Sequence, residues 1–205
     1  MMDRSAPAEY PIDSLLARRW SARAFADRPL EAAVLRQLFE AARWAPSCYN
    51  DQPWYYLVAI RENLQEFQKM LACLVEMNQV WAKAAPVLAI SVARTKFQHN
   101  GAPNRHAQHD VGAASTSLAL EATSLGLAAH QMGGFDAARA RQTYNIPADF
   151  EPMAAIAIGY PGDPAGLPEK QRAAETGPRL RRPISDFVYS GAWASVAPFV
   201  KPGSN

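Results

Sequence analysis

The chain has 205 residues, 49% of them hydrophobic, which is enough for one domain with a sizeable core and argues against disorder. Its 21 basic and 19 acidic residues leave a formal net charge of +2, so the overall charge gives no attraction to nucleic acid or a membrane surface. Two cysteines, no apolar run of membrane-spanning length and no signal-peptide core near Met1 predict a soluble, reduced, cytoplasmic protein.

The apolar pattern alternates between helical and strand-like periods along the chain. We expect helices at 12–19, 30–45, 62–81 and 106–125, a short helix capped by Asp136 and ending near Tyr144, and strands at 54–60, 86–93, 127–131 and 152–158. Residues 94–105 carry little apolar content and predict a flexible loop or lid, and the Pro- and Gly-rich residues 159–183 predict a long surface segment. The tail at 184–200 is unusually apolar for a chain end, which favours packing on a partner subunit.

A stiff, polar loop is predicted at 44–54, between a helix and a strand. Pro46 and Pro53 fix the backbone, and Trp44 and Trp54 flank it with apolar surface. Convergent polar side chains on a rigid loop are typical of a cofactor site, and the candidates here are Ser47, Asn50 and Gln52. Spacing alone is equally compatible with an ordinary helix-to-strand connection.

Two basic clusters and a glycine pair are further candidates. Residues 18–25 combine three arginines with Ser21, and residues 179–182 carry three more; such forked donors suit a phosphate, although a solvated helix end is an equal alternative for the first cluster. Gly133 and Gly134 let backbone amides approach a ligand, or form a tight turn.

Other chemistry is not indicated. The spacing of His99, His106, His109 and Asp110 matches no zinc pattern, so no metal is predicted. No phosphate loop or Rossmann fingerprint is present. Cys48 lacks a predictable histidine base and is better interpreted as a small packing residue than as a nucleophile.

Taken together, these segments resemble the FMN-dependent nitroreductase family. Arg19-Trp20-Ser21-Ala22-Arg23-Ala24-Phe25 is similar to its Arg-x-Ser-x-Arg/Lys-x-Phe motif, and residues 45–54 to its Ala-Pro-Ser-x-x-Asn-x-Gln-Pro-Trp signature. Met132-Gly133-Gly134-Phe135 resembles the turn whose amides meet the flavin, and Arg179-Leu180-Arg181 the late basic pair. The matches come in family order and extend from about Ile12 to Val188.

The resemblance implies a single α+β domain over 1–205, with a mostly antiparallel four-stranded sheet wrapped by helices. It also implies an intimate homodimer in which the C-terminal segment, about 186–205, crosses to the partner. FMN would lie at the dimer interface, with NADPH or NADH as reductant. The implied phosphate contacts are Arg19, Ser21, Arg23 and Arg181, assisted by Arg179. The implied contacts to the ring and ribityl chain are Pro46, Ser47, Cys48, Asn50 and Gln52, largely from the other subunit, and the Gly133 amide would face N5 with Met132 and Gly134 beside it.

The implied chemistry is a ping-pong transfer of electrons from NAD(P)H to nitroaromatic, quinone or similar planar electrophilic acceptors, with no catalytic side chain. Two alternatives stay open: an FMN-binding protein that stores or senses the cofactor, and another flavin chemistry such as reductive dehalogenation or flavin fragmentation. Trp20, which is also counted among the cofactor-binding residues, and Cys48 depart from the residues usual in the family; Trp20 either reshapes the phosphate pocket or packs outward. Either Arg18 or Arg19 could be the phosphate contact.

Overall fold

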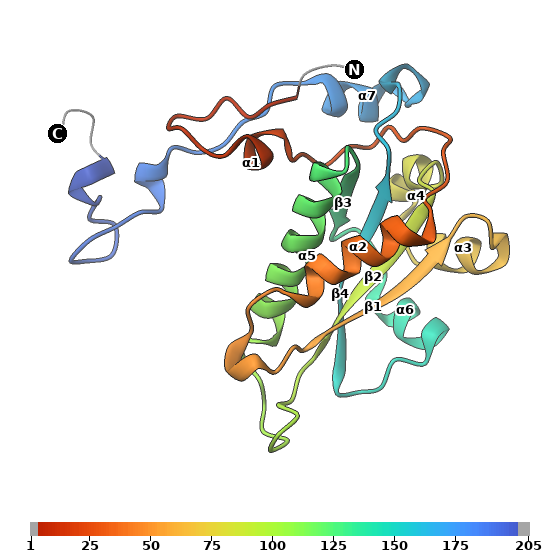
Figure 1. Cartoon of the computed structure of the whole chain (residues 1–205), viewed down its shortest axis with the longest axis horizontal. Coiled ribbons are helices and arrows are strands. Elements are labelled where there is room, and N and C mark those ends of the chain that lie inside the picture. The colour runs from red at the N-terminus through yellow and green to blue at the C-terminus, as the bar shows by residue number, and fades with distance from the viewer. Residues whose placement is uncertain (1–3, 201–205) are drawn as a thin grey trace.

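A computed structural model describes residues 4–200 and places a four-stranded antiparallel sheet at the centre of the molecule (Figure 1). The strands are β1 (Trp54–Ile60), β2 (Val87–Arg94), β3 (Ala128–Met132) and β4 (Phe150–Gly159), in the order β1-β2-β4-β3. β2 and β4 are therefore central, β2 buried up to Ala93 and β4 from Ala155 to Gly159, whereas β1 and β3 form the edges. The predicted antiparallel α+β architecture is confirmed.

Helices cover both faces of the sheet. α2 (Ala32–Arg43) and α5 (Ala107–Ser124) pack on the face that carries Val87 and Ala89 of β2. α3 (Leu64–Leu71), α4 (Glu76–Ala82) and α6 (Ala137–Tyr144) pack on the face that carries Leu88 and Ile90. The alternation of side chains along β2 thus divides the core into two layers.

Most predicted elements are confirmed within two residues at each end, but the long helix expected at 62–81 is wrong. The chain leaves the helix after Leu71 and starts a new one at Glu76. In between, Cys73 O accepts from Asp136 N at 2.8 Å, and Val75 N donates to Gly134 O at 3.1 Å. Backbone bonding to the segment after β3 therefore outweighs a helical periodicity that continues through the break.

The surface segment expected at 159–183 contains an additional helix, α7 (Glu169–Thr176), which the Pro- and Gly-rich composition concealed. Residues 94–105 form a hydrogen-bonded hairpin, in which Phe97 N donates to Ala102 O at 2.8 Å and Asn104 N to Thr95 O at 2.8 Å. Its turn uses Gly101 at φ +71°.

The two terminal segments run side by side, away from the sheet (Figure 1), with Arg4 bonded to Thr176 O and Gly177 O, and Tyr10 to Val200 O. α1 (Ser14–Arg18) is capped by the Asp13 carboxylate, which accepts from Leu15 N at 2.8 Å. The tail beyond Pro183 contains two short 3-10 turns, Ile184–Asp186 and Pro198–Val200, and residues 201–205 of the predicted exchange segment lie outside the described residues. No helix within residues 4–200 has the length and apolarity needed to cross a membrane.

Candidate functional site

The segment after α1 presents its polar side chains on one side. Ala22 and Ala24 are buried, whereas Ser21 and Arg23 alternate with them and are partly exposed. Arg19 Nη1 lies 3.4 Å from Ser21 Oγ, whereas Arg18 is exposed and bonds back to Ser14 O within its own helix. The geometry therefore groups Arg19, and not Arg18, with Ser21.

Arg19, Arg179 and Arg181 form a cluster of like charges. Burial, and then the charge of Arg181, lowers the pKa of Arg19. Burial, and then the charges of Arg19 and Arg181, lowers the pKa of Arg179. Within residues 4–200 none of these three guanidiniums is paired with a carboxylate. They line a hollow of about 940 Å³ between the two terminal segments. An unneutralised group of guanidiniums in a hollow suits a bound phosphate.

Three side chains from the second half of the sequence fix the backbone of this segment. The Glu175 carboxylate, 1% exposed, accepts from Arg23 N at 2.9 Å and from Ala24 N at 3.1 Å. His130 Nδ1 lies 2.9 Å from Ala22 O and must donate, since a carbonyl oxygen only accepts. Arg179 donates to Ala17 O and Arg19 O at 2.9 Å each. Arg179 therefore uses its guanidinium donors on backbone carbonyls and positions the segment. The sequence patterns gave no signal for Glu175 or His130.

Two of these bracing groups carry shifted pKa values. Burial raises the pKa of Glu175, although the amides of Ala24 and Arg23 and the Arg23 charge act in the opposite direction. Burial, reinforced by the nearby Arg23 and Arg19 charges, lowers the pKa of His130 to about 4. The imidazole packs against Trp81 in a tilted arrangement, with ring centroids 4.6 Å apart, and is neutral at physiological pH.

Trp20 faces away from this cluster. Its ring packs against the core beside Glu175 and the 161–164 turn, and the Arg4 guanidinium lies over it at 5.1 Å. The Trp20 side chain thus packs outward, apart from the side chains of Arg19 and Ser21.

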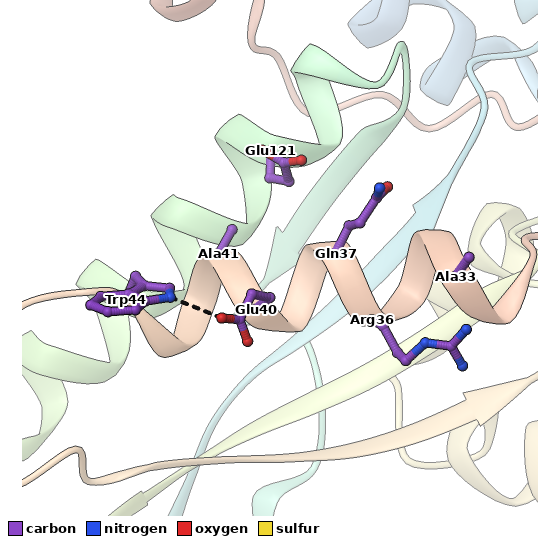
Figure 2. Close-up of a pocket in the computed structure, with 7 residues that line it drawn as sticks. All are labelled: Ala33, Arg36, Gln37, Glu40, Ala41, Trp44 and Glu121. Atoms are coloured by element: carbon purple, nitrogen blue, oxygen red, sulfur yellow. Dashed lines mark hydrogen bonds between the residues drawn. The ribbon is translucent and has the colours of Figure 1, made fainter.

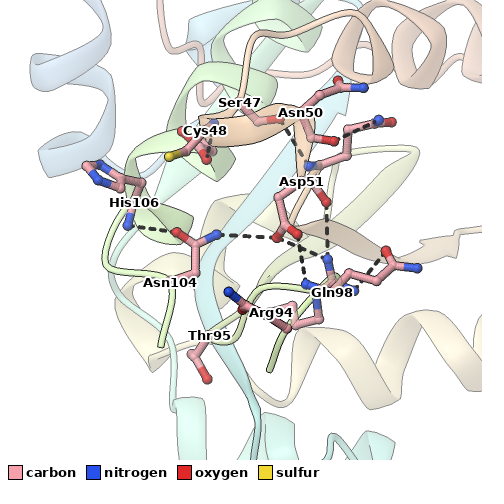
Figure 3. Close-up of polar contacts among 12 residues, drawn as sticks. Ser47, Cys48, Asn50, Asp51, Arg94, Thr95, Gln98, Asn104 and His106 are labelled. Atoms are coloured by element: carbon pink, nitrogen blue, oxygen red, sulfur yellow. Dashed lines mark hydrogen bonds and ion pairs between the residues drawn. The ribbon is translucent and has the colours of Figure 1, made fainter. Parts of the chain in front are cut away.

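The loop at 46–53 is tightly shaped, as its two prolines predicted (Figure 3). Tyr49, Asn50 and Gln52 all have positive φ, between 49° and 53°, which non-glycine residues rarely adopt. Ser47 Oγ accepts from Gln52 N at 3.0 Å, and Cys48 N donates to the buried Asp110 carboxylate at 3.1 Å. Asn50 and Gln52 remain exposed, as a ligand-binding loop requires.

Asp51 fastens this loop to the hairpin at 94–105 (Figure 3). Its buried carboxylate accepts from Gln98 N at 2.9 Å, Arg94 Nη2 at 3.0 Å and Asn104 Nδ2 at 3.3 Å. Burial raises the pKa of Asp51, but the Gln98 amide, Arg94 and Asn104 together bring it below its usual value. Sequence analysis did not single out Asp51; an acidic residue inside a loop of neutral polar residues was the available signal.

The two glycines after β3 have different roles. Met132 is buried in the core, and Gly134 O accepts from Asn78 Nδ2 at 2.9 Å. A Cβ on Gly134 would lie 2.5 Å from Asn78 Nδ2, whereas a Cβ on Gly133 would meet nothing within 4 Å. Gly134 is thus needed for packing against α4, and the backbone at Gly133 borders open space that a planar ligand could occupy.

The loop at 46–53 and the arginine cluster lie at different ends of the chain's fold (Figure 1). Ala22 contacts His130 of β3, which lies opposite Ala157 of β4, and Ala157 lies opposite Leu88 of β2. The loop ends at Trp54 of β1, which lies opposite Ala93 of β2. Five residues along β2 and three strand spacings across the sheet separate the two places, which is roughly 20 Å. A single chain does not bring the two halves of the predicted site together.

Another hollow, of about 540 Å³, lies over α2 and α5 and contains none of the predicted site residues (Figure 2). It is lined by Ala33, Arg36, Gln37, Glu40, Ala41, Trp44 and Glu121. Across residues 4–200, no three His, Cys, Asp or Glu side chains are grouped so that they could hold a metal ion.

The sequence is similar to that of known proteins. The model of the nitroreductase family matches residues 16–160. A protein of Stenotrophomonas maltophilia with the provisional name NADH dehydrogenase/NAD(P)H nitroreductase is 28% identical over 174 residues, covering 76% of this chain and 87% of that protein. A similarly named protein of Streptomyces coelicolor is 29% identical over 177 residues, covering 75% of this chain and 85% of its own.

The fold is similar to that of solved structures. A crystal structure described as an oxidoreductase containing FMN superposes with a TM-score of 0.88 at 34% identity, covering 95% of this chain and 99% of that one. A nitroreductase family protein of Clostridium difficile, 23% identical with a TM-score of 0.67, covers 87% of this chain and 96% of its own and shares the fold. The chain belongs to the nitroreductase family, and is therefore an oxidoreductase.

Proposed function

We propose that this protein is an FMN-dependent oxidoreductase that moves electrons from NADPH or NADH to nitroaromatic, quinone or similar planar acceptors. The observation that carries the proposal is the group of Arg19, Arg179 and Arg181 beside Ser21, in which Arg19 and Arg179 are partly buried and none of the three has a carboxylate partner within residues 4–200. Such a group needs an anion, and the phosphate of FMN supplies one. The 34% identical FMN-containing oxidoreductase of the same fold supports the choice of cofactor.

The chain's own residues fit this cofactor. Arg19, Ser21, Arg23 and Arg181 would hold the phosphate, and Arg179 would add charge while it braces the segment. The open backbone at Gly133, directly after β3, would contact the ring. Bound FMN would supply the redox chemistry, by carrying electrons from one substrate to the other in a ping-pong cycle. Backbone amides and guanidiniums at the ring favour the negative charge that reduction adds.

We propose further that the working unit is a homodimer. The roughly 20 Å across the sheet between His130, which contacts Ala22, and Trp54, where the loop ends, calls for a second copy to bring Pro46, Ser47, Cys48, Asn50 and Gln52 to the cofactor. The tail supports this assembly, because Trp193 is 91%, Phe199 72% and Phe187 49% exposed in the single chain. Packing of the tail on the partner would remove this apolar surface from water.

The test is an absorbance spectrum from about 300 to 600 nm under anaerobic conditions, before and after NADPH or NADH, with the flavin as chromophore. We expect flavin bands that bleach with the reductant and return when a quinone or nitroaromatic is added. Bands that do not bleach would instead assign storage or sensing, and no bands after added FMN would contradict the proposal.

Arginine variants test the phosphate assignment separately. Arg181→Ala and Arg23→Ala should each weaken FMN binding about 10-fold or more, because a charge-assisted hydrogen bond contributes about 1.5–3 kcal/mol. Arg18→Ala is the matched control, because Arg18 bonds only within α1 and is exposed. Equal affinity in all three variants, measured by flavin fluorescence titration, would refute the assignment.

A further inference from the structure

Three aromatic rings gather beside the loop at 46–53. The Tyr49 ring lies 5.9 Å from Phe97 and 6.1 Å from His99, and Phe97 lies 5.3 Å from His99, as centroid distances. Tyr49 meets both neighbours edge-on and is 83% exposed. The phenol ring therefore covers no core and is largely open to solvent within the single chain.

The backbone holds Tyr49 in an unfavourable conformation. A bulky residue at φ +53° is strained, and such strain persists where the surrounding structure fixes it and is concentrated at functional sites. Here the fixing comes from both sides of Tyr49, through the Cys48 amide on Asp110 and through Asp51 on the Gln98 amide. The same Asp51 contact holds Phe97 and His99, the neighbours of Gln98, against Tyr49.

The aromatic group borders a hollow of about 430 Å³ whose wall is shared with the proposed cofactor loop. Tyr49 and His99 line it together with Asn50, Asp51, Gln52 and Gln98. Asn50 and Gln52 are the polar side chains assigned to FMN, so the rings lie directly next to the place where electrons would leave the protein.

We propose that Tyr49, Phe97 and His99 form a binding surface for the aromatic ring of the electron acceptor and thereby favour planar, electron-poor rings over other oxidants. The electron-rich phenol face complements a nitroaromatic or quinone ring, which has lost π density to its substituents. The open hollow admits a ring beside Tyr49, and the exposed amides of Asn50 and Gln52 supply donors for nitro or carbonyl oxygens. This inference rests on the proposed function and names the part of that site that selects the acceptor.

The test compares Tyr49→Ala with Tyr49→Phe in steady-state assays of the purified, FMN-loaded protein. The KM for a nitroaromatic should rise about three- to tenfold in Tyr49→Ala, as the loss of one aromatic pair predicts, and stay near the unaltered value in Tyr49→Phe, which keeps the ring. Turnover with ferricyanide, an acceptor with no ring to stack, should be the same in all three proteins. FMN affinity should also be unchanged.

Two results overturn the inference while the proposed function stands. The first is an unaltered KM for the nitroaromatic in Tyr49→Ala, in a protein that still bleaches with NAD(P)H. The second is a shift of Tyr49→Ala to monomer in size-exclusion chromatography, which would assign the ring to the subunit interface. A protein that binds no FMN, or is not reduced, overturns the proposed function and this inference together.

Discussion

The buried carboxylate of Glu175 offers a sharp test of how the phosphate-binding segment is built. In Glu175→Ala, the amides of Arg23 and Ala24 lose an acceptor whose side chain is 1% exposed. Each unpaired buried amide costs about 1–3 kcal/mol. The ion pair adds little, because Arg23 Nη1 is 4.0 Å away and its side chain is 30% exposed. We expect the free energy of unfolding to fall by about 3–5 kcal/mol.

The assay is urea denaturation of the protein followed by circular dichroism, with thermal melting as a second readout. For a chain of this size the loss corresponds to a Tm lower by roughly 10 °C. Glu169→Ala is the control, because Glu169 lies on the same helix and is exposed, and it should change stability by less than about 1 kcal/mol. Glu175→Gln keeps one acceptor oxygen and should fall between the two. Equal stabilities of the Glu175→Ala and Glu169→Ala proteins would refute the bracing role.

Three further predictions concern other parts of the fold. The pKa of His130 is about 6.5 in the unfolded chain and about 4 in the folded one, so the folded state binds fewer protons at acidic pH. The free energy of unfolding should therefore fall by about 2 kcal/mol between neutral pH and pH 5. His130→Gln should lose this dependence in urea titrations at pH 7 and pH 5. Gly134→Ala should destabilise by about 1–2 kcal/mol by displacing Asn78, whereas Gly133→Ala should keep its melting temperature and weaken FMN binding; the reverse order would contradict the assigned roles. Asp51→Asn should cost about 2–4 kcal/mol, because a donor replaces an acceptor facing Arg94 and Gln98, while Asp149→Asn, whose carboxylate is 55% exposed, should cost under about 1 kcal/mol in the same melts.

Sequence periodicity located the strands and most helices because each strand or helix of this fold buries one continuous apolar face. It failed at 72–75, where the stripe of Met70, Leu71 and Leu74 continues but Cys73 and Val75 bond to the segment after β3. It also missed α7, since a helix with one fully buried residue, the polar Glu175, leaves no apolar stripe to detect. Tertiary contacts decided both cases.

Sequence patterns likewise identified only part of the candidate site. Motif order placed Arg19, Ser21, Arg181 and Gly133 among the candidates, and the structure groups the first three at the terminal segments. Asp51 and His130 could not be found in this way, because their importance comes from burial and from partners more than 20 positions away or on another strand. Local sequence shows which groups could meet a ligand, and only the fold shows which groups hold them.

The long sequence separation of the braces has a consequence for biosynthesis. The segment around Arg23 emerges from the ribosome early, but its acceptor Glu175 lies 152 positions later, and Arg179 follows Arg19 by 160. Contacts of such separation form late in folding. A nascent chain that has completed only the sheet, up to Gly159, therefore holds an unfinished anion site. Under the proposed function, FMN would therefore bind chains whose synthesis has passed α7 and Arg179 in preference to chains that end before them.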